Sequence, residues 1–436
     1  MTDTDALRED FKETPFWWEG ATFDKGDGDR GVPKTADVAV IGGGLTGVSA
    51  AYELARGGRS VVVFDAEEPG QGASSRNAGF LGRHTKHSYL ELCEAVGIDA
   101  ARTLFAEMRE IYDAAVGRIR DEGIDCGFRK CGRFVGALSP RGHSELVREF
   151  EARARQFGEE VEFIPASEKI EIGSKLYHGG VLIVENASIH PDRHFQGLRR
   201  RAEKTGALIV GHTPVLSLQR EKARFDVNTP RGSISVRDVL IATNGYSWGL
   251  APWIDVRLSP IDGYMVATEP LPDGLAKELF PFHRTYIDNR RNFNYMQLSS
   301  DGNRLLFGGR TGRWAASLRQ RARELHQDMA SLFPQLRSVR LTHGWTGRCA
   351  MTWDAFPRTG VHQGINYSLG YCFSGNAMGP HLGTKAARRI LGTGDAQSFF
   401  ERTPFPKMPW PARRRWAITT LARYYEWADR PQPRTN

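Results

Sequence analysis

The chain has 436 residues, a length that allows two or three folding units at the usual domain size. Apolar residues make up 40% of it and ten residues are tryptophan, which excludes a disordered, collagen-like or low-complexity protein. The formal net charge of +8 suits a nucleic acid, an anionic surface or an acidic small molecule as partner, and does not choose among them.

The cysteines and the N-terminal residues indicate the cellular compartment that we expect for this protein. An odd number of cysteines scattered through a long chain is not the pattern of a disulfide-stapled secreted domain. Met1 to Glu13 is acidic and has no apolar stretch, so we expect no signal or transit peptide. The run without charged residues from Thr359 to Thr384 contains six glycines, so we expect no membrane-spanning helix and a cytoplasmic protein.

The first regular elements predict a βαβ unit. Val38 to Ile41 is a short apolar run typical of a buried strand. The glycine-rich segment Gly42 to Gly47 follows it, then a small-residue helix through Arg56 and a second strand at Val61 to Phe64.

This unit carries a dinucleotide-binding fingerprint. Gly42, Gly44 and Gly47 form the pattern GxGxxG at the start of the helix, where they allow a tight turn, close approach of a pyrophosphate and close helix packing. Asp65 ends the second strand eighteen residues after Gly47, where its carboxylate can accept hydrogen bonds from ribose hydroxyls. The pattern predicts dinucleotide binding, with a structural glycine turn as the alternative.

Two later segments favour FAD over NAD. Gly70 to Gly79 is a run of small, hydroxylic and amide residues that can follow an extended phosphate and ribityl chain. Gly375 to Gly379 precedes a predicted helix from His381 to Leu391, whose N-terminus can stabilise negative charge on a reduced flavin ring.

The remaining elements extend two sheets. Helical spacing covers residues 90–120, and a basic helix covers 195–204. A strand at 207–210 returns the chain to the nucleotide-binding sheet. Further strands are predicted at 128–138, 225–229, 236–242, 263–268, 293–298 and 305–308, and a short helix in the basic tail.

We therefore expect an α/β (α+β) two-domain protein. The Rossmann-type FAD-binding domain comprises 1–90, 181–250 and 340–400, and the antiparallel-sheet substrate domain comprises 91–180 and 251–339. Residues 401–436 form a C-terminal tail with a helix.

At this point the sequence resembles the glycine/D-amino-acid oxidase (DAO) superfamily of FAD-dependent amine oxidoreductases, closest to the branch of the gamma-glutamylputrescine oxidoreductases. The resemblance rests on the segments 36–65, 72–79, 242–246, 260–271, 345–347 and 373–375. It implies hydride transfer from the carbon beside nitrogen to flavin N5, followed by hydrolysis of the imine. The residues it implies for FAD are Gly42, Gly44, Leu45, Thr46, Gly47, Asp65, Ala66, Gly72, Ala73, Ser74, Ser75, Arg76, Asn77, Ala78, Gly79, Val215, Ala242, Thr243, Asn244, Gly375, Asn376, Ala377, Met378 and Gly379.

Three residues are candidates for positioning the substrate. Arg83 is similar in position to an arginine that holds the substrate carboxylate in sarcosine oxidases; its alternative is a solvated basic residue. Arg310 is a second candidate anion partner, with a surface ion pair as the alternative. Tyr264 can face the flavin from its strand or belong to the core.

Cys349 falls where sarcosine oxidase-like enzymes attach FAD covalently, but a buried unreactive thiol is the commoner fate of a cysteine, so we expect non-covalent FAD. The other covalent linkage of the superfamily needs a histidine where this chain has Arg76. Leu306 stands where sarcosine oxidases carry a lysine that promotes reaction with dioxygen, so the electron acceptor is dioxygen or an unidentified carrier.

The expected substrate is a primary or secondary amine with an anionic group: a gamma-glutamylated polyamine, an N-alkyl amino acid or an aminophosphonate. The alternatives are a dehydrogenase of the same family that feeds a quinone or carrier, and a non-catalytic or RNA-modifying flavoprotein. The pair Cys126 and Cys131 lies too far from the fingerprint for a disulfide reductase. The basic run from Arg199 to Arg201 lacks a nucleic-acid-binding motif, so we expect no nucleic acid, and we expect no metal.

Overall fold

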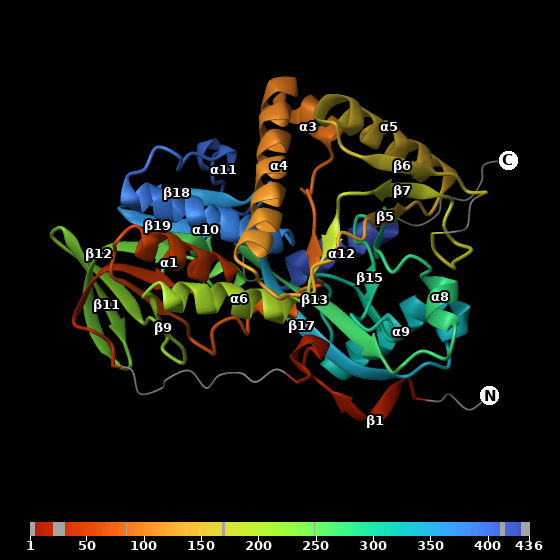
Figure 1. The fold of residues 1–436 in the computed structure, drawn as a ribbon, viewed down its shortest axis with the longest axis horizontal. Helices are drawn as coiled ribbons and strands as arrows, with labels where there is room; N and C mark the ends of the chain where they lie inside the picture. Colours follow the sequence, from red (N-terminus) through yellow and green to blue (C-terminus); the bar gives the residue numbers. More distant parts are fainter. Residues whose placement is uncertain are drawn as a thin grey trace.

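Two large sheets organise the chain in the computed structural model, which describes residues 5–20, 31–83, 85–167, 171–247, 249–409 and 415–428. Figure 1 shows the sheets beside each other, one around β11, β12 and β19 and the other around β13, β15 and β17. A long helix, α4, stands where the two halves meet. The site lies between these halves.

The first sheet has eight strands and contains the βαβ unit. Its spatial order is β10-β11-β12-β2-β3-β9, with β19 paired to β12 and β18 to β19. The neighbours β12, β2, β3 and β9 are parallel, whereas β10, β11 and β12 form an antiparallel meander. The strands are β2 (Thr35–Ile41), β3 (Val61–Phe64), β9 (Leu208–Val210), β10 (Ser217–Glu221), β11 (Arg224–Thr229), β12 (Gly232–Ile241), β18 (Arg358–His362) and β19 (Ile365–Leu369).

Helices cover one face of this sheet and share a single core with it. They are α1 (Leu45–Arg56), α4 (Ile98–Asp121), α6 (Pro191–Lys204) and α10 (Gly375–Leu391). The helices α1 and α10 approach closely because Gly383 has no side chain: a Cβ there would lie 2.3 Å from the Thr46 carbonyl oxygen. This packing brings the N-termini of α1 and α10 to one place.

The second sheet has nine strands in the order β1-β17-β13-β16-β15-β14-β5-β7-β6. The pairs β1/β17 and β14/β5 are parallel and the others antiparallel. The strands are β1 (Leu7–Lys12), β5 (Arg133–Gly136), β6 (Val161–Ile164), β7 (Gly180–Ile183), β13 (Ser259–Thr268), β14 (Thr285–Asp288), β15 (Tyr295–Leu298), β16 (Leu305–Gly309) and β17 (Leu341–Met351).

The two faces of the second sheet have different neighbours. Val266 and Phe307 pack in one core with Leu325 and Met329 of α9 (Leu318–Leu332). On the other face, a smaller cluster joins Met265, Leu306 and Trp345 to Trp17. Successive residues of a strand point to opposite faces, so Val266 and Met265 serve different cores.

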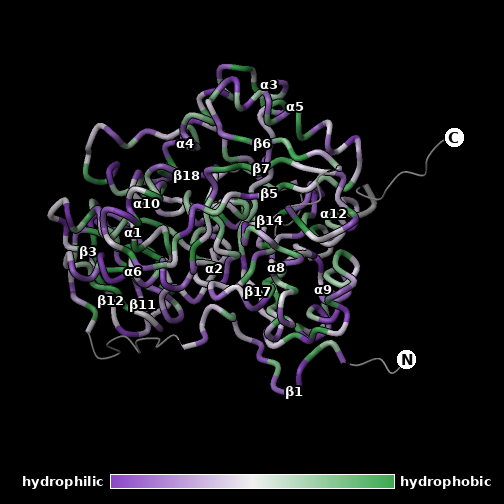
Figure 2. Tube along the Cα trace, turned by 45° about the vertical axis from the view of Figure 1, so that its right-hand side comes forward, coloured by the Kyte–Doolittle hydropathy of each residue, from purple (hydrophilic) through white to green (hydrophobic). Residues whose placement is uncertain are grey.

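The remaining helices and strands complete the described chain. They are η1 (Phe16–Trp18), α2 (Ala73–Arg76), β4 (Phe80–Leu81), α3 (Tyr89–Val96), α5 (Pro140–Phe157), β8 (Ala187–Ser188), η2 (Asn244–Tyr246), α7 (Pro252–Asp255), α8 (Leu275–Leu279), η3 (Pro334–Leu336), α11 (Phe399–Arg402) and α12 (Arg415–Ala428). Serine side chains cap several helices: Ser88 forms a capping box with Glu91, and Ser317 accepts a hydrogen bond from the Gln320 amide. In Figure 2, hydrophobic colour follows inner strands such as β3 and β7.

The expected two-domain α/β fold with a Rossmann-type unit is confirmed. The first strand, helix and second strand of the fingerprint are β2, α1 and β3, and residues 90–120 form α3 and α4. The expected strand at 128–138 shrinks to β5, because only Arg133–Gly136 pairs continuously with its neighbours, and Arg129 forms an isolated bridge with Ser188. The tail helix is α12, and its Ile418 and Ala422 pack against Gly312.

The domain boundaries differ from those expected in three places. β17 belongs to the substrate sheet although residues 340–400 were assigned to the FAD-binding domain. β1 extends the same sheet through a parallel pair with β17. α4 packs against α10 and shares a core with α1, so residues 98–121 lie with the FAD-binding half. No helix of the described ranges is both long and apolar enough to cross a membrane.

Candidate active site

A cavity of about 870 Å³ runs between the two halves. One end is lined by the fingerprint loop, Asp65 and Val215, and the other by β13, β14 and β17. A volume in this range matches sites for cofactors and small molecules. The two ends can be described separately.

At the first end, backbone geometry makes the glycines of the fingerprint necessary. Gly42 has φ +103°, in the region that favours glycine. A Cβ on Gly47 would lie 1.9 Å from the Gly42 carbonyl oxygen, so any side chain there would force the helix away from the strand. The α1 N-terminus is therefore open to an approaching pyrophosphate, as FAD requires.

Asp65 fixes the loop and keeps an acid at the edge of the cavity. Its Oδ2 accepts a hydrogen bond from the Gly43 amide at 2.7 Å, and its Oδ1 accepts one from the Glu67 amide at 3.0 Å. Burial raises the pKa of Asp65 to about 6, because the ionised carboxylate loses hydration. Carboxylate oxygens have further lone pairs, so they can still accept hydrogen bonds from ribose hydroxyls.

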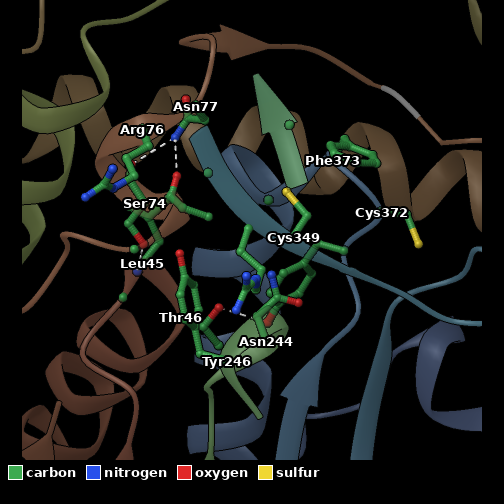
Figure 3. Close-up of a pocket in the computed structure, with 18 of the residues that line it drawn as sticks. Leu45, Thr46, Ser74, Arg76, Asn77, Asn244, Tyr246, Cys349, Cys372 and Phe373 are labelled. Atoms are coloured by element: carbon green, nitrogen blue, oxygen red, sulfur yellow. Dashed lines mark hydrogen bonds between the residues drawn. The ribbon is translucent and has the colours of Figure 1, made fainter. Parts of the chain in front are cut away.

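The middle of the cavity is held by α2 and by the start of α10. Ser74 Oγ accepts a hydrogen bond from the Leu45 amide at 3.0 Å. The Asn77 side-chain amide donates to the Ser74 carbonyl at 2.9 Å, a contact visible in Figure 3. Asn376, near the first residue of α10, donates from Nδ2 to Asn77 Oδ1 at 2.8 Å. These bonds connect two helix N-termini, both of which favour negative charge in a ligand.

Cys349 lines the cavity from β17, as the sequence suggested. Burial raises the pKa of its thiol to about 12, so the nucleophilic thiolate is disfavoured. Cys349 and Cys372 are both free, and Figure 3 shows their sulfurs directed differently. Next to Cys372, Phe373 is 42% exposed and has φ +74°, a strained backbone in a residue that lines the cavity.

Most of the residues assigned to FAD from the sequence line this cavity. Five do not, and they support its walls from behind: Gly47, Ser75, Gly79, Met378 and Gly379. Ser75, for example, accepts a hydrogen bond from the Trp18 indole and donates one to the Gly70 carbonyl. Gly379 packs against Thr46, where a Cβ would lie 3.1 Å from the Thr46 hydroxyl.

The structure brings none of the three predicted substrate-positioning residues into the cavity wall. Arg83 is buried and donates to Glu185, so its charge is already neutralised. Arg310 donates from Nε and Nη2 to the carboxylate of Asp328 on α9, at 2.5 and 2.7 Å.

Tyr264 lies on the face of β13 that packs toward α9, with the Arg321 guanidinium 4.8 Å from its ring centre. Its strand neighbours Gly263 and Met265 line the cavity instead, and Tyr264 takes the core position that the sequence offered as the alternative.

Sequence reasoning did not single out one buried cation of the cavity wall. Arg133 on β5 lines the cavity and is 2% exposed. The signal for it was an arginine within a short run of otherwise apolar strand residues. Sequence reasoning also missed the aromatic residues Phe80, Phe293, Tyr295 and Trp345 of the wall.

A two-domain fold, a glycine-cradled dinucleotide loop and a second cavity end on an antiparallel sheet define a flavoprotein oxidoreductase. Residues 37–389 match the family of FAD dependent oxidoreductases (DAO), and the chain belongs to it. It is thus an FAD-dependent oxidoreductase of the class that acts on the C–N bond of amines and amino acids.

Relatives agree with this assignment. The chain is 31% identical over 402 residues to the gamma-glutamylputrescine oxidoreductase of Escherichia coli, covering 91% of this chain and 93% of the relative. It is 30% identical over 380 residues to a probable oxidoreductase, OrdL, of Haemophilus influenzae, covering 86% and 87%. The fold is similar to that of glycine oxidase from Geobacillus kaustophilus, with a TM-score of 0.70 at 23% identity, covering 87% of this chain and all of that structure.

Proposed function

We propose that this enzyme oxidises a primary or secondary amine that also carries an anionic group. The observation that carries the proposal is the single cavity that joins the fingerprint loop to the inner face of the substrate sheet. Its relatives are named for gamma-glutamylputrescine and glycine, two amines that both bear a carboxylate.

The chemistry divides between the cofactor and the chain. The loop from Gly42 to Gly47, Asp65 and the start of α10 would hold FAD, which would supply a hydride acceptor for the carbon beside nitrogen. The nitrogen would lose a proton to solvent, and water would hydrolyse the released imine to a carbonyl compound and an amine or ammonia. The chain positions the amine and keeps water from the reacting carbon through apolar wall residues such as Met265 and Trp345. The α10 N-terminus, beside Asn376, provides positive potential for the charge left after hydride transfer.

FAD binding is non-covalent in this proposal. The raised pKa of Cys349 supports it, because a protonated thiol does not attack the ring. Acid precipitation of the purified protein should leave the yellow colour in the supernatant. Colour in the pellet would contradict this part of the proposal and identify Cys349 as the attachment site, provided that Cys349→Ser releases it.

The main experiment is an anaerobic screen in which amines with and without a carboxylate are mixed with the holoenzyme and flavin absorbance is followed. We expect bleaching by a carboxylate-bearing amine and much slower bleaching by its uncharged analogue. No bleaching by any amine would refute amine oxidation and favour a non-catalytic or RNA-modifying flavoprotein.

The electron acceptor is the second open choice. Leu306 is fully buried in the cluster that contains Met265 and Trp345, and it has no charge to assist dioxygen. This favours a dehydrogenase that passes electrons to a quinone or carrier over an oxidase. Peroxide release and dye reduction, measured with the same amine, separate the two: equal rates would identify an oxidase.

A further inference from the structure

We infer that Arg133 binds a carboxylate of the substrate and thereby selects amines with an acid group. The inference deepens the proposed function and rests on it. Its basis is a buried cation in the cavity wall that pairs with no carboxylate among the residues that the structure describes.

The guanidinium of Arg133 has only neutral partners among the described residues. Its Nε donates to Thr285 Oγ1 at 3.2 Å and its Nη2 donates to the Leu81 carbonyl at 3.4 Å. Its charged carbon lies 4.7 Å from the centre of the Phe80 ring. A buried charge without an opposite charge is costly, so its retention needs a ligand or a structural reason.

Neighbouring groups do not supply that opposite charge. The backbone carbonyl of Glu185 accepts a hydrogen bond from Tyr112, but the Glu185 carboxylate forms an ion pair with Arg83. Burial lowers the pKa of Arg133 to about 9, with only small opposing effects from Cys131 and Tyr112, so the side chain stays a cation at neutral pH. Arg133 therefore brings uncompensated positive charge to the cavity.

The contacts of Phe80 place this charge where the substrate end meets the middle of the cavity. The Phe80 carbonyl accepts a hydrogen bond from Asn376 Nδ2 at 3.2 Å, and Asn376 also bonds to Asn77. Phe80 thus contacts both Arg133 and Asn376, the second residue of α10. Asn376 in turn bonds to Asn77, which follows α2. The start of α10 and α2 line the part of the cavity where the reacting ring would be held.

The side chain also suits a carboxylate chemically. A guanidinium offers parallel N–H donors that match the two oxygens of a carboxylate. Phe80 covers one face, and Thr285 and Leu81 fix the orientation, so little side-chain entropy is lost on binding. Ile287, two residues after the Thr285 that pairs with Arg133, also lines the cavity wall and adds an apolar side chain there.

The test measures ligand binding to the oxidised holoenzyme, which needs no turnover. Phenylacetate is the anionic probe and phenylacetamide its neutral counterpart, and binding is followed by flavin absorbance and by thermal shift. We expect Arg133→Met to weaken phenylacetate binding by roughly 10- to 100-fold and to leave phenylacetamide unchanged. Arg133→Lys, which retains a charge, should fall between the two.

Arg118→Met is the matched control. Arg118 is a half-buried arginine that bonds to a neutral partner, Thr384, but it lies in the helical layer and outside the cavity wall. The Arg118→Met variant should bind phenylacetate and phenylacetamide with the affinities of the wild type. Ligand-free Arg133→Met should unfold at the same temperature as the wild type or higher, since it removes an unneutralised buried charge.

Several outcomes would overturn the inference. The first is that wild type and Arg133→Met bind phenylacetate with equal affinity. The second is that Arg133→Met loses affinity for phenylacetate and phenylacetamide equally and unfolds at a lower temperature. The third is that the wild type binds phenylacetate no more tightly than phenylacetamide. Failure of the proposed function would give a different result: phenylacetate binding would still depend on Arg133, but no amine would bleach the flavin.

Discussion

The two ends of the cavity are built in different ways. The cofactor end is made of backbone: the loop from Gly42 to Gly47, helix N-termini and the amide that bonds to Asp65. The substrate end is made of side chains such as Arg133 and Met265, carried by strands far apart in the sequence. Backbone geometry constrains the first end tightly, whereas single substitutions can change the charge and shape of the second.

Gly47→Ala, at the cofactor end, is the variant with the largest expected effect. The new methyl group would meet the Gly42 carbonyl oxygen at 1.9 Å, so α1 must move from β2. We expect FAD affinity to fall by more than roughly 100-fold and the free energy of unfolding by about 3 kcal/mol. Fluorescence titration of the apoprotein with FAD and urea unfolding measure the two effects.

Gly117→Ala on α4 is its control, because the nearest atom to the new methyl is Asp121 Oδ2 at 3.8 Å. That variant should gain up to about 1 kcal/mol, as alanine favours helix. Similar effects at Gly47 and Gly117 would mean that the close contact at the fingerprint is not a constraint.

Next in size is Arg83→Met, which separates a structural arginine from the ligand-binding one. It leaves the Glu185 carboxylate without its partner in a mostly buried place, and we expect a loss of about 2 to 3 kcal/mol in the free energy of unfolding. Urea titration measures the loss, and Arg83→Met with Glu185→Gln should recover most of it. If instead Arg83→Met abolished discrimination between phenylacetate and phenylacetamide, the sequence-based assignment of Arg83 would be right after all.

The cofactor end should also respond to pH through Asp65. Its pKa is raised from the ordinary 3.8 to about 6 in the folded protein, and ribose hydroxyls hydrogen-bond best to the ionised form. FAD affinity should therefore be constant above about pH 6 and fall by up to roughly tenfold per pH unit below it. For the apoprotein the sign is opposite: the folded state binds the extra proton, so this group's contribution to stability is present below pH 3.8 and is lost as pH rises to about 6.

Apoprotein titrations with FAD across this pH range, repeated with Asp65→Asn, check the assignment. The variant should bind FAD more weakly and with a flatter pH profile. An unchanged profile would mean that another group governs the titration.

The smallest effect belongs to Arg310→Met. Its partners Asp328 and Glu324 are partly solvated, so the ion pairs contribute about 1 kcal/mol or less to the free energy of unfolding. Thermal unfolding at two salt concentrations measures this, and phenylacetate affinity should not change. A large loss of phenylacetate affinity would instead indicate that Arg310 contacts the substrate.

The same contrast explains what the sequence revealed. The fingerprint could be predicted because strand, turn, helix and acid follow one another within thirty residues and each glycine has a local steric reason. The sequence left two positions open for Tyr264 because the inward face of β13 depends on pairing with β17, and alternation alone leaves two phases. The ion pair of Arg83 could not be predicted because its partner, Glu185, is distant in the sequence.

The parallel pair of β1 with β17 has a consequence for synthesis on the ribosome. Leu7 pairs with Leu341, so the second sheet needs strands from both ends of the chain. Until β17 emerges, β13 lacks the neighbour on one side and exposes an unpaired edge beside Met265 and Val266. Exposed strand edges promote association between chains, so we expect nascent chains of this protein to depend on chaperones until almost all of the sequence has been translated.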